Sequence, residues 1–121
     1  MKRLVLILFL SLFANACLAG EDPTLVCDVG PVTKAFGNTD WLAYSCRDHS
    51  SIVFIAAPGS AVEPYYFFLH RWNGKYLAQG EGNGNQKSVI AANAQIRALS
   101  TAQMTAIVAE TIRAAARKKA Q

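Results

Sequence analysis

The sequence predicts an α+β fold: a mostly antiparallel sheet of about four to five strands, then two C-terminal helices, with one disulfide bond. Three features predict it. Asn73-Gly74 separates two strand-like segments, and the apolar period changes from two to about 3.6 after a glycine-rich segment at residues 80–85. Two cysteines also remain once a leader segment is set aside. Together these features place the strands before the helices.

Residues 1–19 have the composition of a secretory signal peptide. Lys2 and Arg3 precede an apolar run at residues 4–13, and small residues follow it. The apolar run is shorter than the roughly 20 residues that a membrane-spanning helix needs. The sequence therefore predicts export and no transmembrane segment after cleavage.

Two processing routes are open at the end of this leader. Cys17 and Ala19 satisfy the small-x-small rule, which predicts cleavage after Ala19, whereas lipidation at Cys17 is the alternative. We expect cleavage, which leaves one small domain at residues 20–121, periplasmic or else secreted. Loss of Lys2 and Arg3 lowers the net charge from +4 to +2. So small a charge does not predict a nucleic-acid partner.

Cys27 and Cys46 are the cysteines of the expected domain. Thiols in exported proteins are commonly oxidised, and two cysteines allow one pairing. Free buried thiols and a metal site are the alternatives, but no histidine or third cysteine lies at ligand spacing. We therefore predict a disulfide between Cys27 and Cys46, with no metal and no cofactor.

The first strands are short. Residues 24–29, which are β-branched in part, and residues 32–36 are predicted as two strands separated by Gly30-Pro31. A hairpin follows, in which apolar residues 41–46 and β-branched residues 52–57 flank a polar turn.

Asn73-Gly74 is the strongest local signal in the chain. A two-residue type I′ turn needs positive φ at both positions, which Asn-Gly tolerates best, so residues 66–72 should pair with residues 75–79. One face of this pair would carry Phe67, Leu69, Arg71, Tyr76 and Ala78, and the other Phe68, His70, Trp72, Lys75 and Leu77. Neither face is cleanly polar. Two helices can cover only one of them, so the other faces solvent or a partner.

The glycine-rich residues 80–85 are predicted as a flexible connector that ends the sheet. The first helical stripe after it comprises Val89, Ala92, Ile96 and Leu99. Ser100 and Gln103 form a capping box that starts a second helix, with Leu99 and Met104 at the flanking staple positions. Its apolar stripe comprises Met104, Ile107, Val108, Thr111, Ile112 and Ala115.

Aromatic residues around the hairpin form the candidate binding surface. The candidate residues are Tyr66, His70, Arg71, Trp72, Lys75 and Tyr76. Aromatic and arginine side chains dominate binding hot spots, although the same cluster would also suit a sheet core beneath the helices. The exposed set is either Tyr66, His70, Trp72 and Lys75, or Tyr65, Arg71 and Tyr76.

No residue pattern predicts catalysis, and a non-enzymatic protein is expected. Residues 48–51 contain the residue types of a hydrolytic triad, but consecutive turn residues point apart. The glycines of residues 80–85 lack phosphate-loop spacing. His70 lies among aromatic residues, where a lone histidine is usually packed and hydrogen-bonded. The alternative is a small hydrolase or ligand carrier with a pocket between sheet and helices, near His70 or Glu81.

The C-terminus is basic, with Arg113, Arg117, Lys118 and Lys119 at the end of the predicted helix. Cations there complement the helix dipole. Weak attraction to anionic lipids or acidic wall polymers is the functional alternative.

Tyr44-Ser45-Cys46, the polar turn and residues 52–57 together resemble a segment of the small periplasmic lysozyme-inhibitor proteins, which are disulfide-closed antiparallel sheets. The two predicted helices depart from that all-strand pattern, so neither its fold nor its inhibitory loop is transferred and no family is assigned. We expect a macromolecular binding or envelope accessory module. Inhibition of a cell-wall hydrolase is the narrower alternative.

Overall fold

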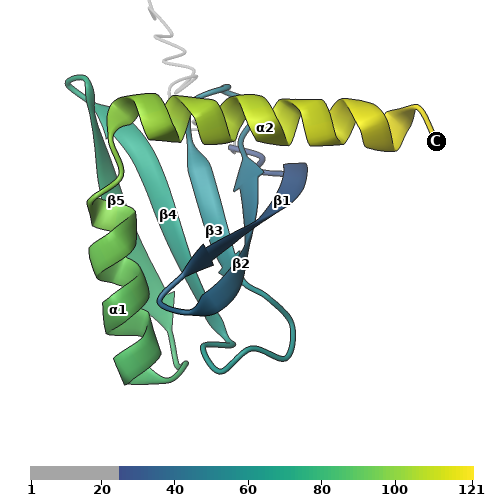
Figure 1. Cartoon of the computed structure of the whole chain (residues 1–121). Coiled ribbons are helices and arrows are strands. Elements are labelled where there is room, and N and C mark those ends of the chain that lie inside the picture. Colours follow the sequence, from purple (N-terminus) through teal and green to yellow (C-terminus); the bar gives the residue numbers. More distant parts are fainter. Residues whose placement is uncertain (1–24) are drawn as a thin grey trace, which may run out of the picture.

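The computed structural model describes residues 25–121, a five-stranded antiparallel sheet followed by two helices (Figure 1). The elements are β1 (Val29–Phe36), β2 (Thr39–Ser45), β3 (Ile52–Ala56), β4 (Tyr65–Trp72), β5 (Lys75–Gly82), α1 (Gln86–Arg97) and α2 (Thr101–Lys119). The strands lie side by side in chain order. The predicted α+β fold is confirmed. The expected signal peptide and the alternative lipidation site at Cys17 lie outside the described residues.

β1 differs from the prediction of two strands at residues 24–29 and 32–36. It is one strand that starts at Val29 and continues through Gly30 and Pro31, with an irregularity in its pairing to β2 between Val29 and Val32. An edge strand tolerates proline because one side of its backbone has no strand to bond. Gly30 has φ of +130°, and a Cβ there would lie 3.0 Å from the Ala43 carbonyl oxygen. The strand therefore continues past the Gly-Pro pair with a local shift in register rather than ending there.

The β4–β5 hairpin confirms the predicted turn. Asn73 and Gly74 have φ of 51° and 76°, as a type I′ turn requires. β5 continues to Gly82, so the prediction that glycines 80–82 belong to a flexible connector was wrong. A Cβ at Gly80 would lie 2.8 Å from both the Tyr65 hydroxyl oxygen and the Phe67 ring. The missing side chain thus leaves space for the aromatic rings of β4.

Both helix starts have side-chain caps. The Asn85 side chain accepts hydrogen bonds from the backbone N–H groups of Lys87 and Ser88 at the start of α1. For α2, Ser100 Oγ accepts from Gln103 N at 3.1 Å, and Gln103 Oε1 accepts from Ser100 N at 2.7 Å. The predicted capping box is confirmed, whereas Asn85 was assigned to the connector.

α2 crosses one end of the sheet and continues past β1 (Figure 1). The buried Thr111 hydroxyl lies 2.7 Å from the Ser45 hydroxyl of β2, and Lys34 of β1 forms a 2.6 Å ion pair with Glu110. Ile112, predicted on the apolar stripe, is 38% exposed. The described chain has no strand beyond β1 to cover that end of the helix.

The core lies between the sheet and the two helices. Its largest fully buried side chains include Trp41, Ile52, Phe54, Phe67 and Leu69 from the sheet and Ile96 and Met104 from the helices. These sheet residues share one face, because side chains alternate along each strand. The expectation that two helices cover only one sheet face is therefore confirmed.

Candidate functional site

The opposite face of the sheet is not covered by any helix or strand of residues 25–121 (Figure 1). We call it the bare face and define it by Leu42, Tyr44, Val53, Ile55, Tyr66, Phe68, His70, Trp72, Lys75, Leu77, Gln79 and Glu81, which alternate with the core residues. Cross-strand pairing aligns them in rows, one running Leu42, Ile55, Tyr66 and Glu81 and the next Tyr44, Val53, Phe68 and Gln79. The rows make the bare face continuous across β2 to β5.

Large apolar side chains are exposed on this face. Ile55 is 41% exposed, Tyr66 42%, Leu77 47% and Trp72 64%. A single exposed apolar side chain is common on protein surfaces, but a contiguous apolar patch on a small protein marks an interaction surface. The bare face is therefore the candidate functional site.

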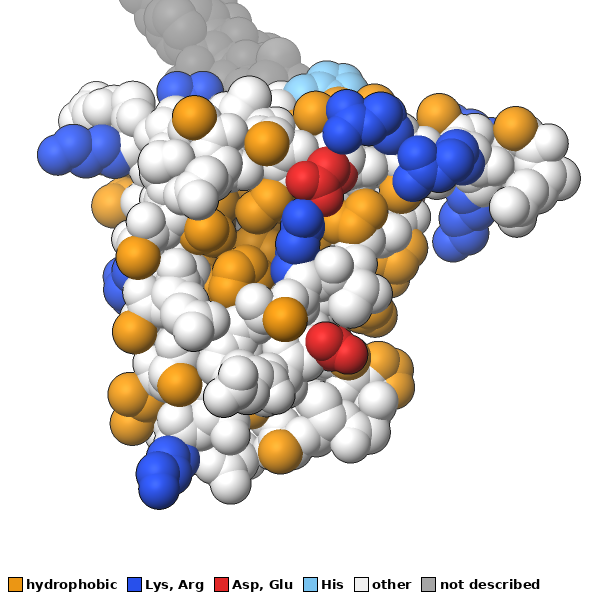
Figure 2. Space-filling view, viewed as in Figure 1, with side chains coloured by type: hydrophobic (Ala, Val, Ile, Leu, Met, Phe, Trp, Pro, Cys, Tyr) orange, Lys and Arg blue, Asp and Glu red, His pale blue; other side chains and the backbone are white. Residues whose placement is uncertain are grey.

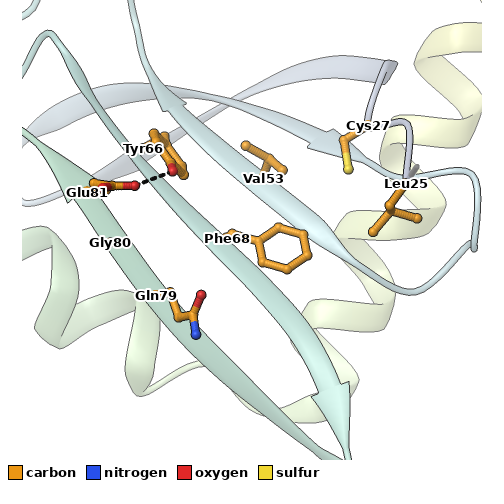
Figure 3. Close-up of a pocket in the computed structure, with 8 residues that line it drawn as sticks. All are labelled: Leu25, Cys27, Val53, Tyr66, Phe68, Gln79, Gly80 and Glu81. Atoms are coloured by element: carbon orange, nitrogen blue, oxygen red, sulfur yellow. Dashed lines mark hydrogen bonds between the residues drawn. The ribbon is translucent and has the colours of Figure 1, made fainter. Parts of the chain in front are cut away.

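Two hollows lie side by side on the bare face. The larger, of about 630 Å³, is lined by Leu25 and Cys27 from the N-terminal segment and by Phe68 and Gln79 from the sheet (Figure 3). The smaller, of about 380 Å³, is lined by Ile55 and Pro64 among others, and we call it the Pro64 hollow. Val53, Tyr66 and Glu81 line both hollows. The two hollows therefore form one open, mostly apolar trough rather than an enclosed pocket.

Tyr66 and Glu81 supply the polar contact between the hollows. The Tyr66 hydroxyl donates to Glu81 Oε2 at 2.6 Å across the two strands (Figure 3). This hydrogen bond and the negative charge of Glu81 raise the pKa of Tyr66 above 10.0, its ordinary value. Tyr66 is thus a neutral hydrogen-bond donor at physiological pH, and the carboxylate of Glu81 is its acceptor.

The structure divides the predicted binding residues between the two faces. Tyr66, His70, Trp72 and Lys75 lie on the bare face. Arg71 and Tyr76 pair with each other on the helix side, where the Arg71 guanidinium lies 5.7 Å from the Tyr76 ring centroid. The Tyr76 hydroxyl also donates to the Ser50 carbonyl oxygen at 2.9 Å.

Sequence reasoning missed the members of the bare face that come from β2 and β3. Leu42, Tyr44, Val53 and Ile55 join the hairpin residues only through the cross-strand register. A signal was present, because alternation within residues 52–57 puts Val53 and Ile55 on one face. That alternation does not indicate which face of the sheet the helices cover.

His70 is packed on the bare face. Its ring stacks on Phe68 with centroids 5.7 Å apart and an interplanar angle of 21°. Its Nδ1 is buried and has no hydrogen-bond partner among residues 25–121. The ring therefore contributes an aromatic surface to the trough.

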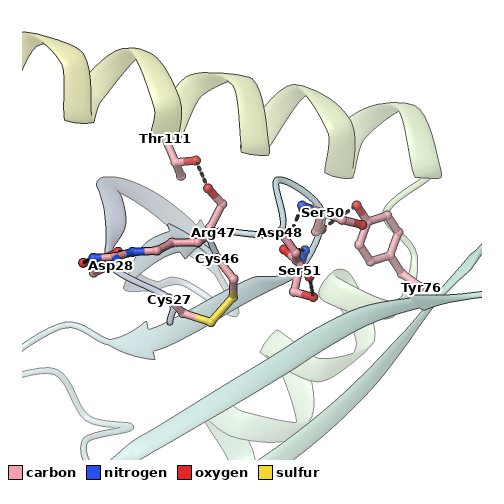
Figure 4. Close-up of a disulfide and its surroundings, with 10 residues drawn as sticks. Cys27, Asp28, Cys46, Arg47, Asp48, Ser50, Ser51, Tyr76 and Thr111 are labelled. Carbon is pink, nitrogen blue, oxygen red and sulfur yellow. Dashed lines mark hydrogen bonds and ion pairs between the residues drawn. A yellow bond between two sulfur atoms is a disulfide. The ribbon is translucent and has the colours of Figure 1, made fainter. Parts of the chain in front are cut away.

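Residues 48–51 form a turn rather than a catalytic triad. The Asp48 carboxylate accepts hydrogen bonds from the Ser50 and Ser51 backbone N–H groups and, at 2.6 Å, from the Ser51 hydroxyl (Figure 4). His49 has φ of 57°, a conformation common in turns. The carboxylate is thus used by the turn itself.

The disulfide lies beside this turn. Cys27 and Cys46 are bonded, as predicted, and join the N-terminal segment to the end of β2 (Figure 4). Arg47 makes a two-pronged ion pair with Asp28, at 2.8 and 3.2 Å. Hydrogen bonding to Arg47 lowers the pKa of Asp28 below 3.8, its ordinary value. These links hold residues 25–28 at the edge of the larger hollow.

Asp48 is expected to make stability depend on acid pH. Burial alone raises the pKa of Asp48, but the hydrogen bonds from Ser51 and Ser50 outweigh it, so the pKa lies below 3.8. The carboxylate therefore stabilises the fold fully above the unfolded-state pKa and loses this effect as pH falls through the lower folded-state pKa. Asp48→Ala should cost about 1 kcal/mol near neutral pH.

Urea unfolding of the wild type, Asp48→Ala and Asp48→Asn from about pH 6 to about pH 2 checks this expectation. Asp48→Asn retains an acceptor oxygen but not the charge. The stability difference between wild type and Asp48→Asn should shrink as the pH falls. A difference that stays constant across this range would contradict the assignment.

Two hollows lie where the helices meet the sheet and its loops. One, lined by Leu69, Ile96 and Met104 among others, has a volume of about 130 Å³, and the other, lined by Val29, His49 and Ile112 among others, has a volume of about 590 Å³. His70 and Glu81, which the hydrolase or carrier alternative places near such a pocket, lie on the bare face instead. That alternative therefore lacks its two proposed residues at the sheet–helix interface.

Three further features of the described residues bear on function. No group of three or more His, Cys, Asp or Glu side chains within residues 25–121 could hold a metal ion. Neither α1 nor α2 combines the length and apolar character that a membrane crossing requires. Lys and Arg side chains gather along the C-terminal part of α2 (Figure 2), where Arg117, Lys118 and Lys119 occupy the last turn.

Known proteins give no further guide to this site. Comparisons of the chain with models of protein families, with curated proteins and with solved structures find no match, so the inference of function rests on the bare face itself.

Proposed function

We propose that this chain is a small exported, non-enzymatic protein that binds another protein of the cell envelope through its bare face. The observation that carries the proposal is the exposure of Ile55, Tyr66, Trp72 and Leu77 on a sheet face that both helices leave free. Exposed apolar area of this kind is stabilised by removal from water when a partner docks.

The composition of the bare face supports a protein partner. Tyr and Trp are among the side chains that most often act as binding anchors, and Trp72 has the largest exposed fraction among the large apolar residues of this face. The polar residues of this face include Lys75, Gln79 and Glu81, which lie along β5, the strand at one edge of the sheet. The result is an apolar centre with a polar rim along one edge, the anatomy of a protein interface.

Two features support export. Residues 1–19 have the composition of a leader. The Cys27–Cys46 disulfide suits an oxidising compartment, where such bonds form and persist.

Trp72→Ala is expected to weaken partner binding about 30-fold, the effect of losing a typical hot spot of about 2 kcal/mol. The purified, oxidised chain of residues 20–121 would be immobilised and used to capture proteins from cell-envelope extract. Affinity for the captured protein would then be measured for the wild type, Trp72→Ala and Tyr66→Ala.

Ile90→Ala provides the matched control, because Ile90 is a large apolar residue as exposed as Trp72 and lies on α1, away from the bare face. It should bind as the wild type does. Equal binding by folded Trp72→Ala and wild type would remove the bare face from consideration. If the captured protein is a cell-wall hydrolase, stoichiometric addition of this chain should lower its turnover.

A further inference from the structure

The bare face carries opposite charges at the two ends of β5. Lys75 lies opposite Trp72 beside the hairpin turn, and Glu81 lies opposite Tyr66 at the other end of the strand pair. At about 3.3 Å per residue, Lys75 and Glu81 lie about 20 Å apart along β5. Both are exposed, and neither takes part in an ion pair within residues 25–121.

A projecting side chain and a hollow also lie at opposite ends of the bare face. Trp72 stands beside Lys75 at one end, whereas the Pro64 hollow lies beside Glu81 at the other. This hollow has a volume of about 380 Å³ and is lined mostly by apolar groups, including Ile55 and Pro64. One end of the bare face therefore has a projecting tryptophan and a positive charge, whereas the other end has an apolar hollow and a negative charge.

We propose that the bare face binds a second copy of this chain in a two-fold, face-to-face pair. Trp72 of each copy enters the Pro64 hollow of the other, and Lys75 of each copy pairs with Glu81 of the other. The two-fold axis lies in the plane of the interface, perpendicular to the strands, so the strands of the second sheet run opposite to those of the first. The Lys75 end of each copy then faces the Glu81 end of the other, and the two contacts are equivalent by symmetry.

The arrangement follows from ordinary sheet packing. Two sheets pack face to face about 10 Å apart with their strands aligned within about 30°. The apolar residues of both copies, including Phe68 and Leu77, would then form the interior of a sandwich, with the charged pairs at its rim. Rim pairs mainly select the orientation of the two copies, while the apolar burial supplies most of the affinity.

This inference goes beyond the proposed function: both use the bare face, but neither requires the other. Self-association would close that face, so a protein partner must compete with the second copy. Binding of the partner then depends on the concentration of the chain itself.

Reversal of one charge is expected to weaken the dimer about tenfold or more, because like charges then meet at both ends of the symmetric interface. Sedimentation of the oxidised chain of residues 20–121, at concentrations from about 1 μM to about 1 mM, would give the dimer dissociation constant. The variants are Lys75→Glu and Glu81→Lys. Lys87→Glu, a reversal on the exposed start of α1, is the control and should leave the constant unchanged.

A mixture of the two reversal variants tests the pairing directly. Lys75→Glu presents acidic groups at both ends of the bare face, and Glu81→Lys presents basic groups at both ends. Each alone should be largely monomeric, whereas an equimolar mixture should form a mixed dimer about as tight as the wild type. Circular dichroism of each variant would verify its fold.

Two outcomes would overturn the self-association: a wild-type chain that stays monomeric up to about 1 mM, or folded reversal variants that fail to associate when mixed. A monomeric wild type that still loses its envelope partner on Trp72→Ala leaves the proposed function standing. A dimer that responds to charge reversal while the chain captures no protein supports the self-association and removes the proposed function.

Discussion

Trp41→Ala is expected to lower the free energy of unfolding by about 3–5 kcal/mol. Trp41 is fully buried beneath the helices, and its indole N–H donates to the Phe36 carbonyl oxygen at 3.1 Å. Its ring packs on those of Phe67 and Tyr65, with centroids 5.3 and 6.4 Å away. Truncation would open a cavity at the centre of the core and leave a buried carbonyl without its partner.

Trp72→Ala is the matched control, because it removes the other of the two tryptophans, which is largely exposed. Its effect on stability should stay within about 0.5 kcal/mol. Urea unfolding followed by circular dichroism measures both variants without relying on tryptophan fluorescence. The two variants distinguish the two faces of the sheet, because Trp41→Ala should lower stability whereas Trp72→Ala should weaken binding. Equal losses of stability would contradict this division of the sheet.

Removal of the disulfide is expected to lower the free energy of unfolding by about 3 kcal/mol. Cys27 and Cys46 lie 19 positions apart in the sequence, and their bond restricts the unfolded chain. It also holds Leu25 and Cys27 at the larger hollow. Loss of the bond should therefore affect both stability and the shape of the bare face.

The measurement compares urea unfolding of the oxidised chain, the chain in reductant, and the Cys27→Ala/Cys46→Ala double variant. Reductant should shift the unfolding midpoint of the wild type to lower urea and leave the double variant unchanged. A wild-type midpoint that does not respond to reductant would show that the bond contributes nothing to the equilibrium.

Local sequence signals determined much of this fold. Asn73-Gly74 predicted a type I′ turn, because few other residue pairs accept positive φ twice, and both residues have positive φ in the structure. Ser100 and Gln103 predicted the start of α2 through hydrogen bonds that join residues three positions apart. The two cysteines of the expected domain likewise left one pairing.

Sequence features whose structural cause lies in another strand led to wrong predictions. Gly30-Pro31 and the glycines at residues 80–82 suggest chain breaks when they are considered by themselves. In the structure, β1 continues past Gly30 and Pro31 with a shift in register, and Gly80 makes room for the rings of Tyr65 and Phe67. The reason for each glycine lies in a neighbouring strand, which local patterns do not identify.

The candidate site shows the same division. Alternation along β4 and β5 sorted Tyr66, His70, Trp72 and Lys75 onto one face and Arg71 and Tyr76 onto the other from the sequence alone, as the register confirms. Only tertiary packing decided which set is exposed, because both faces are apolar enough to receive a helix. Core burial brings both helices onto the Trp41 face, and the opposite face is left without a helix.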